Sequence, residues 1–361
     1  MYFLLSMRGG NGGEEIWADS TMRAMRNLGY TVLYAASLPE AVHLYHIIPD
    51  LVKIVIVNDW DSFKCDADKQ GCVQSEQNPT GIPLHKIFSF YFWPFPRHPL
   101  GQRWVLAPEP FALQPDPNLV SNNTYLGYSI EADCALTPFV PPAARPAHAW
   151  VLAKLLRYLQ PARGASWVKA DFDAAAHRTG VTFALGAGLS NDEAEADRVA
   201  LEEGLPDSHI NYGRMQKAEF MGKVAQTKVL VGVGLPLISP TPYNALCLGV
   251  PFINPLDGWD EANPDDTTKY HGQHAMMAFM KPPYVYNVRK GDRDGFVNAV
   301  AAALANPIES YVPERMRMSA VEARLAEIVD HDWEAEARRQ AEWCNEPCGC
   351  LTPCDMRATA N

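Results

Sequence analysis

The first feature of this chain that can do chemistry is a glutamate directly after a glycine-rich turn. The segment Gly9–Gly13 precedes Glu14, and Glu14 opens a stretch with helical periodicity that runs to Leu28. Glycines let a ligand come close to the backbone, and a carboxylate in a first helical turn is stabilised by the helix dipole. If it faces a cleft, Glu14 can take a proton from an incoming hydroxyl as a general base. The alternative is an ordinary first-turn acid.

A second candidate lies in Val229–Pro255, which predicts a strand, a turn, a short helix and a second strand. The apolar run Val229–Val233 suits a strand buried on both faces. Gly234 ends it, and Pro240 and Pro242 suit the first turn of a helix. The pattern places a helix N-terminus, with free N–H groups, at the carboxyl end of a parallel sheet, where phosphates and nucleotides bind. A βαβ unit without a ligand is the alternative.

Other polar motifs are less specific. Asp59-Trp60-Asp61 follows a predicted strand and has the D-x-D form of metal-dependent sugar transfer, but two acids after a strand more often form a solvated turn. The ten histidines show no metal-ligand spacing. No G-x-S-x-G motif is present, which argues against an α/β-hydrolase.

The eight cysteines favour disulfides and an oxidising compartment. Cys65 and Cys72 form a close pair in a polar loop, and Cys247, inside an apolar helix, is expected to be a buried thiol. A zinc site in the C-terminal cluster is the rival interpretation, but the C-x3-C-x-C-x3-C spacing lacks the usual C-x2-C pair. The sequon at Asn122 would be glycosylated in a luminal protein. The C-terminal cluster consists of Cys344, Cys348, Cys350 and Cys354.

Composition narrows the possible partners. The chain has 361 residues, 47% of them hydrophobic, which is enough for two domains with their own cores. Its net charge of −11 argues against nucleic acid or an anionic membrane surface as partner. No apolar run reaches the ~18–20 residues of a transmembrane helix, and the first residues are too short for a signal peptide. The protein is therefore either cytosolic or preceded by a targeting segment, and the cysteines favour the second possibility.

Alternating strand and helix patterns predict two domains of the α/β class with parallel sheets. The proline-rich segment 137–148 is the expected linker. The expected domains are 1–140 and 141–343, the second with closing helices, followed by a Cys-rich tail at 344–361. Residues 60–120 look loop-rich, and 149–159 fits either a helix or a strand. Strands are expected at 2–7, 31–35, 52–57, 124–130, 181–185, 229–233 and 251–254, and helices at 14–28, 39–46, 167–178, 192–203, 218–226, 294–305 and 314–342.

Taken together, these segments resemble glycosyltransferase family 18, the α-1,6-mannosylglycoprotein 6-β-N-acetylglucosaminyltransferases of the N-acetylglucosaminyltransferase V type. The similarity is strongest in VLVGVGLPLISPTPYNALCLGVPFINP. The turn Ile210–Gly213, the loop Gly272–His274, the segment Pro283–Tyr286 and the glycine turn ending at Glu14 are also similar to the family. The resemblance is distant and patchy but spans most of the chain.

The resemblance implies a GT-B fold, with two Rossmann-like domains whose parallel sheets face a central cleft. It implies inverting, metal-independent transfer of N-acetylglucosamine from UDP-GlcNAc to a mannose hydroxyl of an N-glycan in the Golgi lumen. No cofactor is expected beyond the nucleotide sugar, and the glycan of a glycoprotein is the expected acceptor. The family's membrane anchor is absent from this sequence, so membrane attachment is expected only through an anchor outside it.

The resemblance also assigns roles to residues. Glu14 corresponds to the catalytic base, and the start of segment 149–159 becomes the first strand of the second domain. The helix at Pro242 would face the diphosphate. The residues implied on the donor side are Lys154, Asn211, Gly213, Gly234, Pro240, Pro242, Asn244, Gln273 and His274.

Two departures leave rival functions open. The family carries glutamates at the positions of Ile238 and Asn244, and neither acid is present here. Asn244 can still hydrogen-bond a ribose hydroxyl, whereas Ile238 cannot. The alternatives are therefore a different nucleotide sugar, a catalytically silent GT-B relative that binds glycan or protein, or a cytosolic enzyme that acts on a small molecule.

Overall fold

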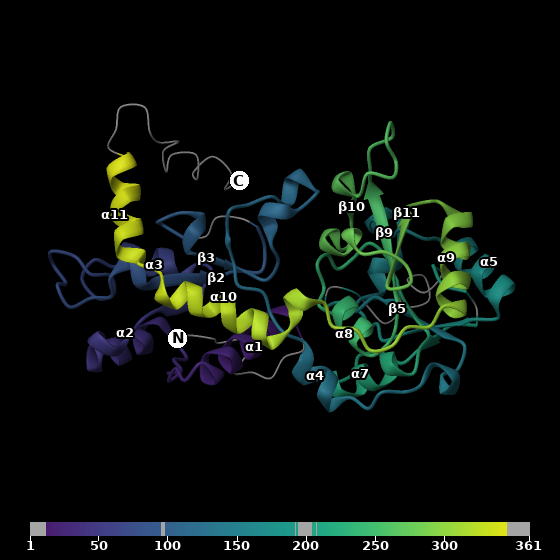
Figure 1. Ribbon diagram of the computed structural model, residues 1–361, viewed down its shortest axis with the longest axis horizontal. Coiled ribbons are helices and arrows are strands. Elements are labelled where there is room, and N and C mark those ends of the chain that lie inside the picture. Colours follow the sequence, from purple (N-terminus) through teal and green to yellow (C-terminus); the bar gives the residue numbers. More distant parts are fainter. Residues whose placement is uncertain (1–11, 95–97, 192, 194–203, 207, 345–361) are drawn as a thin grey trace.

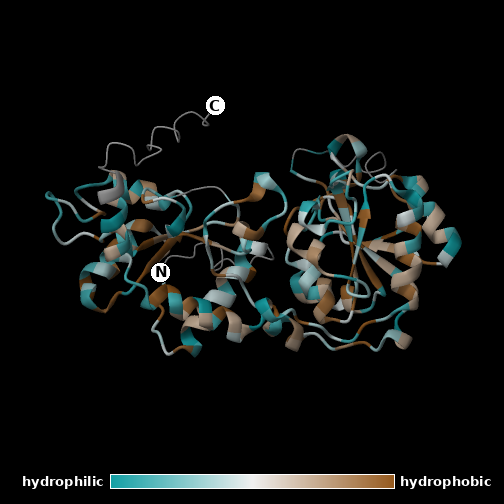
Figure 2. Ribbon diagram, turned by 45° about the horizontal axis from the view of Figure 1, so that its top comes forward, coloured by the Kyte–Doolittle hydropathy of each residue, from teal (hydrophilic) through white to brown (hydrophobic). Residues whose placement is uncertain are grey.

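The computed structural model describes residues 12–94, 98–191, 193, 204–206 and 208–344. Two α/β domains lie side by side, each built on its own sheet (Figure 1). The sheets are apolar inside and are covered by amphipathic helices, as the brown strands and mixed helices of Figure 2 show. The predicted fold class of two α/β domains with parallel sheets is therefore confirmed.

The first domain contains a four-stranded parallel sheet in the order β1-β2-β3-β4. Its strands are short and almost wholly buried. Ser37 caps α2 by accepting a hydrogen bond from the Glu40 N–H. The elements are α1 (Gly13–Asn27), α2 (Leu38–Ile47), β1 (Val55–Asn58), α3 (Asp61–Ala67), β2 (Ile87–Phe90), β3 (Val105–Ala107), β4 (Thr124–Tyr125) and α4 (Glu131–Leu136).

Several expectations for this domain need correction. Residues 31–35 form no strand: Val32 and Tyr34 pack against the core, but this segment pairs with no strand among the described residues. Apolar composition indicates burial and cannot by itself supply a hydrogen-bonding neighbour. Conversely, β2 and β3 lie inside the stretch expected to be loop, because strands of three or four residues are too short for a periodic signal. The strand expected at 2–7 lies outside the described residues.

The second domain has a parallel sheet in the order β7-β6-β5-β8-β9-β11, and β10 pairs antiparallel with the end of β9. In chain order this is 3-2-1-4-5-6, the doubly wound Rossmann order. The structure settles segment 149–159, because its start lies in β5. The elements are β5 (His148–Leu152), α5 (Lys169–Thr179), β6 (Thr182–Leu185), β7 (Ile210–Asn211), α7 (Lys217–Ala225), β8 (Val229–Gly232), α8 (Thr241–Cys247), β9 (Phe252–Gly258), β10 (His271–Gly272), β11 (Val285–Arg289) and α9 (Arg293–Ala305).

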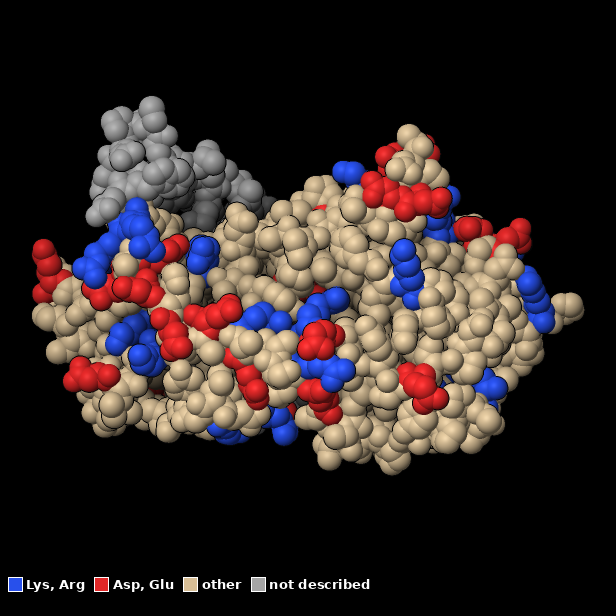
Figure 3. Space-filling view, viewed as in Figure 1, with Lys and Arg blue, Asp and Glu red and all other residues tan. Residues whose placement is uncertain are grey.

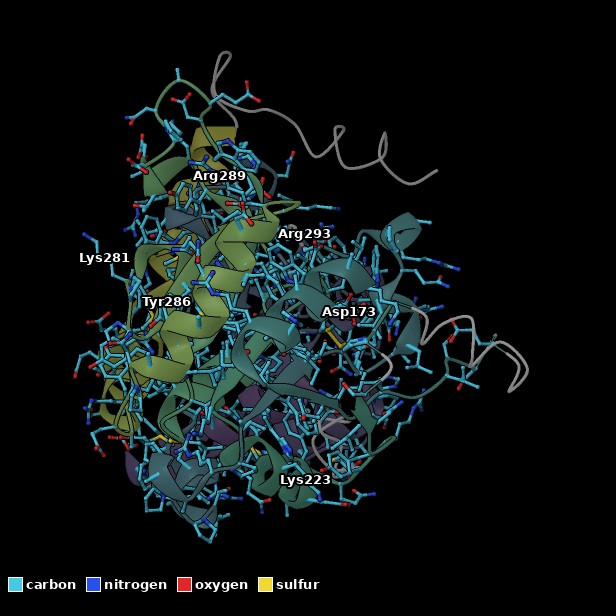
Figure 4. The ribbon with its side chains drawn as sticks, turned by 90° about the vertical axis from the view of Figure 1, so that its right-hand side faces the viewer. Asp173, Lys223, Lys281, Tyr286, Arg289 and Arg293 are labelled. Carbon is cyan, nitrogen blue, oxygen red and sulfur yellow. A yellow bond between two sulfur atoms is a disulfide. The ribbon has the colours of Figure 1, made fainter. Side chains whose placement is uncertain are left out.

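Helices α5 and α9 pack together on one face of this sheet. Phe296 of α9 lies edge-on to Phe172 of α5, and Arg293 forms an ion pair with Asp171 at 2.9 Å. Figure 4 looks onto this side, with Arg293 on α9 and Asp173 on α5 labelled. The helix expected at 192–203 falls almost entirely outside the described residues.

The closing helices return to the first domain. The segment expected as one helix is instead a turn at η13 (Glu314–Met316), then α10 (Met318–Asp330) and α11 (Trp333–Cys344). In Figure 1, α10 runs from the second domain back beneath the first. Trp333 is buried beside Phe88 and Trp104, with ring centroids 4.8 and 5.4 Å away. These helices therefore contribute to the core of the first domain rather than the second.

Two disulfides are present among the described residues. Cys65–Cys72 is the predicted pair, although Cys65 lies in α3 and both cysteines are buried rather than in a polar loop. The expectation that Cys247 is a free thiol is wrong, because it is bonded to Cys134 of α4. The separation of 113 positions between these cysteines means that the sequence alone could not predict the pairing. In the C-terminal cysteine cluster, Cys344 is the last residue of α11, and Cys348, Cys350 and Cys354 lie outside the described residues.

The surface carries charges of both signs (Figure 3). Acidic residues gather on the projecting loop between β9 and β10. None of the helices in the described parts of the chain is long and apolar enough to cross a membrane. The loop acids are Asp260, Glu261, Asp265 and Asp266, and Asp257 lies near the end of β9.

Candidate functional site

The starts of α1 and α8 meet where the two domains touch. A methyl group on Gly13, the first residue of α1, would lie 2.7 Å from the Phe92 ring and 3.3 Å from Cδ of Pro240. Pro240 is the N-cap of α8, and Glu14 is the residue after Gly13. The predicted catalytic turn and the predicted donor helix, 226 positions apart in the chain, are thus brought into contact.

This close approach gives a direct test of the junction. The Gly13→Ala substitution should lower the free energy of unfolding by about 1–3 kcal/mol, because the new methyl group overpacks against Phe92. Gly222→Ala is the matched control: it lies inside α7 with nothing within 4 Å of the new methyl, so it should stabilise by about 0.5–1 kcal/mol. Equal effects of the two substitutions in denaturant titrations would contradict the junction.

The backbone donors at the start of α8 are already used. The Thr241 N–H donates to Ser239 Oγ at 3.3 Å, Pro242 has no N–H, and those of Tyr243 and Asn244 donate to the Pro240 carbonyl. The expectation of free N–H groups here is therefore wrong, because the N–H groups of this short first turn already donate to Ser239 and Pro240. The polar groups left at this end are the hydroxyls of Ser239 and Thr241, both half-buried.

The topological switch point of the second sheet lies between β5 and β8, since the chain leaves them in opposite directions. Lys154 follows β5 and is exposed, and Gly234 follows β8 with a left-handed φ of +101°. A side chain at Gly234 would lie 3.0 Å from both the Gly164 carbonyl oxygen and Ser166 Oγ. The loop 164–166, which the sequence analysis did not single out, thus joins the predicted residues at the usual ligand edge of such a sheet.

Gln273 holds the loop that follows β8 at this edge of the sheet. It is only 2% exposed, its Oε1 accepts from the Gly234 N–H at 3.0 Å, and its Nε2 donates to the Pro236 carbonyl at 3.1 Å. Both ends of the amide are therefore used to hold the loop after β8. Gln273 was predicted on the donor side, and its contacts are those of a residue that positions the loop.

Asn211 and Gly213 form the predicted turn after β7. Asn211 Oδ1 accepts hydrogen bonds from the N–H groups of Ala187 and Gly213, at 3.2 and 2.9 Å. Gly213 has a φ of +70° with open space around it. Between them, Tyr212 is 39% exposed, and Lys223 Nζ lies 4.1 Å from the centre of its ring (Lys223 is labelled in Figure 4). The turn thus places an aromatic ring, with the Lys223 cation of α7 over it, at the carboxyl end of the edge strand β7.

The two positions that depart from the resembled family are both buried. Ile238 is 1% exposed and adopts a left-handed φ of +46°, unusual for a β-branched residue. Asn244 is 3% exposed, and its Nδ2 contacts Met221 Sδ at 3.2 Å. Neither side chain is free to meet a solvent-borne ligand in this arrangement.

His274 belongs to a buried polar group that the sequence did not reveal. Its Nε2 lies 3.8 Å from Oε1 of Glu109, and both residues are at most 1% exposed. Its ring meets the Tyr243 ring edge-on at 5.0 Å, and Arg315 donates a hydrogen bond to the Tyr243 hydroxyl. Glu109, Tyr243, His274 and Arg315 come from four separate segments without a shared motif. We call these four residues the interdomain cluster.

Burial controls the charges of the interdomain cluster. It raises the pKa of Glu109 from 4.5 to about 7, against the opposing effect of the Arg315 guanidinium. Burial, and then the charge of Arg315, lower the pKa of His274 to about 3, so this imidazole is neutral. Burial also raises the pKa of Tyr243 well above its ordinary value.

The D-x-D motif shows no sign of metal binding. Asp61 is 6% exposed and pairs with Lys64 at 2.7 Å, while the Asp59 carbonyl accepts hydrogen bonds from Ser62 and Ser89. Nowhere in the described chain do three or more His, Cys, Asp or Glu side chains gather as metal ligands.

A cavity of about 590 Å³ lies away from these residues, at the amino ends of β3 and β4. Arg103, Asn122 and Thr124 are among its lining residues. Ligands of parallel α/β sheets bind at the opposite, carboxyl edge. We therefore place the candidate site at the α1–α8 junction and the switch point.

Two Rossmann-like domains with parallel sheets, tied together by helices that return from the second to the first, constitute the GT-B architecture of glycosyltransferases. Residues 195–355 match the sequence model described as Glycosyltransferase family 18. The predicted resemblance to this family is thus confirmed, and the second half of the chain carries a glycosyltransferase domain.

Curated relatives agree with this assignment. The alpha-1,6-mannosylglycoprotein 6-beta-N-acetylglucosaminyltransferase A of Rattus norvegicus is 25% identical over 140 residues, and that of Homo sapiens 24% over 140 residues. Each match covers 35% of this chain and 18% of the relative, so the match spans less than a fifth of the relatives' length.

Solved structures with a similar course of the chain include AviGT4, a glycosyltransferase involved in avilamycin A biosynthesis. It has a TM-score of 0.48 and 13% identity, and the match covers 92% of this chain and 89% of that one. Spinosyn rhamnosyltransferase SpnG complexed with thymidine diphosphate has a TM-score of 0.35 and 15% identity, covering 94% and 84%.

Proposed function

We propose that this protein transfers a sugar from a nucleoside-diphosphate sugar, UDP-GlcNAc first among the candidates, to a mannose hydroxyl of an N-glycan. The close approach of Gly13 to Pro240 carries the proposal, because Glu14 directly follows Gly13 and Pro240 caps the helix proposed to face the donor. In an inverting displacement the hydroxyl attacks from the face opposite the leaving group, so the base and the diphosphate must lie on opposite sides of the sugar. The family match supports the same chemistry.

In this proposal Glu14 deprotonates the acceptor hydroxyl, and the second domain holds the leaving diphosphate without a metal. Lys154 and the hydroxyls of Ser239 and Thr241 are the polar groups available near the switch point and the start of α8. A fixed cation and fixed donors stabilise charge that develops on a leaving group. The two disulfides fit an oxidising compartment, and we propose the secretory pathway as the location.

Stabilisation by nucleotides tests the donor assignment. UDP and UDP-GlcNAc, without metal, should raise the melting temperature, since a ligand that binds only the folded state adds RT ln(1 + [L]/Kd) to stability. At 100 times Kd the gain is about 2.7 kcal/mol. ADP and GDP serve as controls for the base. An equal response to all three nucleotides, or a response only with Mn²⁺, would contradict the proposal.

A catalytically silent relative is the second candidate. The burial of Ile238 and Asn244 favours it, because the resembled family has acids at these positions. A silent relative would show neither stabilisation by UDP nor hydrolysis of UDP-GlcNAc, and would bind glycan or protein through the first domain. The same nucleotide panel therefore separates the two functions.

A further inference from the structure

The interdomain cluster lies close to the start of α8, which is part of the candidate site. Tyr243 is the third residue of α8, so it lies within a turn of Pro240 and the α1 contact. Glu109 follows β3 of the first domain, and His274 precedes η12 (Ala275–Phe279) of the second. Arg315 lies in η13, on the segment that leaves the second domain for α10 (Figure 1). The first domain, the second domain and the segment that connects them to α10 thus all supply members of the cluster.

Contacts join the cluster to both domains. Arg315 reaches the Tyr243 hydroxyl, and its guanidinium carbon lies 5.3 Å from the centre of that ring. The Arg315 carbonyl accepts from Nη2 of Arg324 at 2.9 Å, and Arg324 Nε donates to the Leu126 carbonyl of the first domain at 2.7 Å. A continuous series of contacts therefore links the first turn of α8 to the backbone that directly follows β4 in the first domain.

Several polar atoms of the cluster are buried without a hydrogen-bond partner among the described residues. They include both carboxylate oxygens of Glu109 and both ring nitrogens of His274. Buried polar and charged groups are costly to separate from their neighbours and contribute little net stability. Their best-attested use is to fix one arrangement of the elements that carry them.

We propose that the interdomain cluster is a positioning latch that fixes the first turn of α8 against the turn carrying Glu14. Its importance for catalysis rests on the proposed transferase function, whereas its effect on the α1–α8 contact does not. Tyr243 is the positioning residue on α8, and Arg315 connects it to the first domain. Glu109 of the first domain and His274 of the second lie next to each other across the junction.

The latch also responds to protons. Glu109 faces Arg315, Arg324, Tyr125, Tyr128, Tyr243 and His274. Below its pKa of about 7 the acid is neutral beside the neutral His274 ring, and above it the carboxylate is charged and interacts with the guanidinium of Arg315. The folded protein then retains at Glu109 a proton that the unfolded chain loses near pH 4.5, so the Glu109 contribution to stability falls as the pH rises from 4.5 to 7. The contribution of His274 has the opposite sign, because its lowered pKa keeps it neutral when folded while the unfolded chain is protonated below pH 6.5.

Hydrogen exchange measured by mass spectrometry, without any nucleotide, tests the latch. In Tyr243→Phe, which removes only the hydroxyl, amide exchange should become about tenfold faster in peptides covering the first turns of both α1 and α8. Glu109→Gln should make the change in melting temperature from pH 4.5 to 7 more positive than in the wild type, because it removes the contribution of Glu109 and leaves that of His274. Glu314→Gln is the matched control, since this neighbour of Arg315 has a side chain 84% exposed. Exchange unchanged in Tyr243→Phe, or faster evenly throughout the protein, would overturn the latch.

Kinetics separates failure of the latch from failure of the proposed function. If transfer is observed, Tyr243→Phe should lower kcat about tenfold with little change in the KM of the donor, because misalignment affects the reacting geometry more than binding. If no nucleotide binds the wild-type protein, the exchange result alone decides on the latch. Normal kcat together with normal exchange in Tyr243→Phe would refute the latch and leave the transferase proposal standing.

Discussion

Replacing Glu14 with glutamine should lower the rate of sugar transfer by about 10²–10⁴-fold and leave UDP binding unchanged. Glutamine keeps the size and hydrogen-bonding reach of the side chain but cannot accept the proton of the acceptor hydroxyl. In the proposed function the second domain holds the donor, so we expect its affinity not to depend on this carboxylate. Release of UDP from UDP-GlcNAc in the presence of a mannose-terminated N-glycan gives the rate, and calorimetric titration with UDP gives the affinity.

Glu15 offers a matched control for this experiment. It has the same chemistry, lies in the same first turn of α1 and is also half-buried. Glu15→Gln should therefore lose far less activity than Glu14→Gln. If Glu14→Gln turns over at the wild-type rate, Glu14 is not the base; if Glu15→Gln is the inactive variant, the base is one residue further along.

Replacing Arg145 with alanine should lower the free energy of unfolding by about 3–5 kcal/mol, the cost of breaking a buried charged network. Arg145 is 4% exposed and donates to the carbonyls of Val140, Thr227, Leu248 and Gly249 at 2.7–3.1 Å. Removing the guanidinium leaves these buried oxygens without their donor, and each costs about 1–3 kcal/mol when unsatisfied.

The Arg145 substitution also bears on the site, because Leu248 and Gly249 end the helix whose start contacts Gly13. Arg163→Ala is the control: this arginine is exposed in a surface turn and should change stability by less than about 0.5 kcal/mol. Urea titrations of both variants give the two free energies. A loss below 1 kcal/mol for Arg145→Ala would mean that the linker is not anchored through this residue.

Local segments were largely predictable from the sequence. The helix after the glycine turn begins at Gly13 and the second helix at Leu38, within a residue or two of expectation, because capping residues and helical periodicity are local signals. The buried strand β8 and the short helix α8 follow the apolar run and the prolines in the same way. The alternation of these elements is enough to indicate parallel α/β domains.

Errors arose where the outcome depended on distant partners. The segment at 31–35 has the composition of a strand but lacks a pairing strand in the described chain, while β2 and β3 are too short to be recognised. The sequence shows Arg145 in the linker but could not predict its hydrogen bonds, because its four acceptors are backbone carbonyls, which carry no sequence signal. Cys247 looked like a core thiol because Cys134 is 113 residues away.

The sequence by itself determined the class of the domains, the family relationship and the candidate residues Glu14, Lys154 and Gly234, since each depends on residue types within a short window. The tertiary structure decided which of these meet. It places Gly13 next to Pro240, and it uses the amide of Gln273 in hydrogen bonds to the loop after β8. It also pairs the backbone N–H groups at the start of α8 with acceptors in the same turn. It also assembled the interdomain cluster, because burial and charge pairing between remote segments are properties of the packed chain and not of any stretch within it.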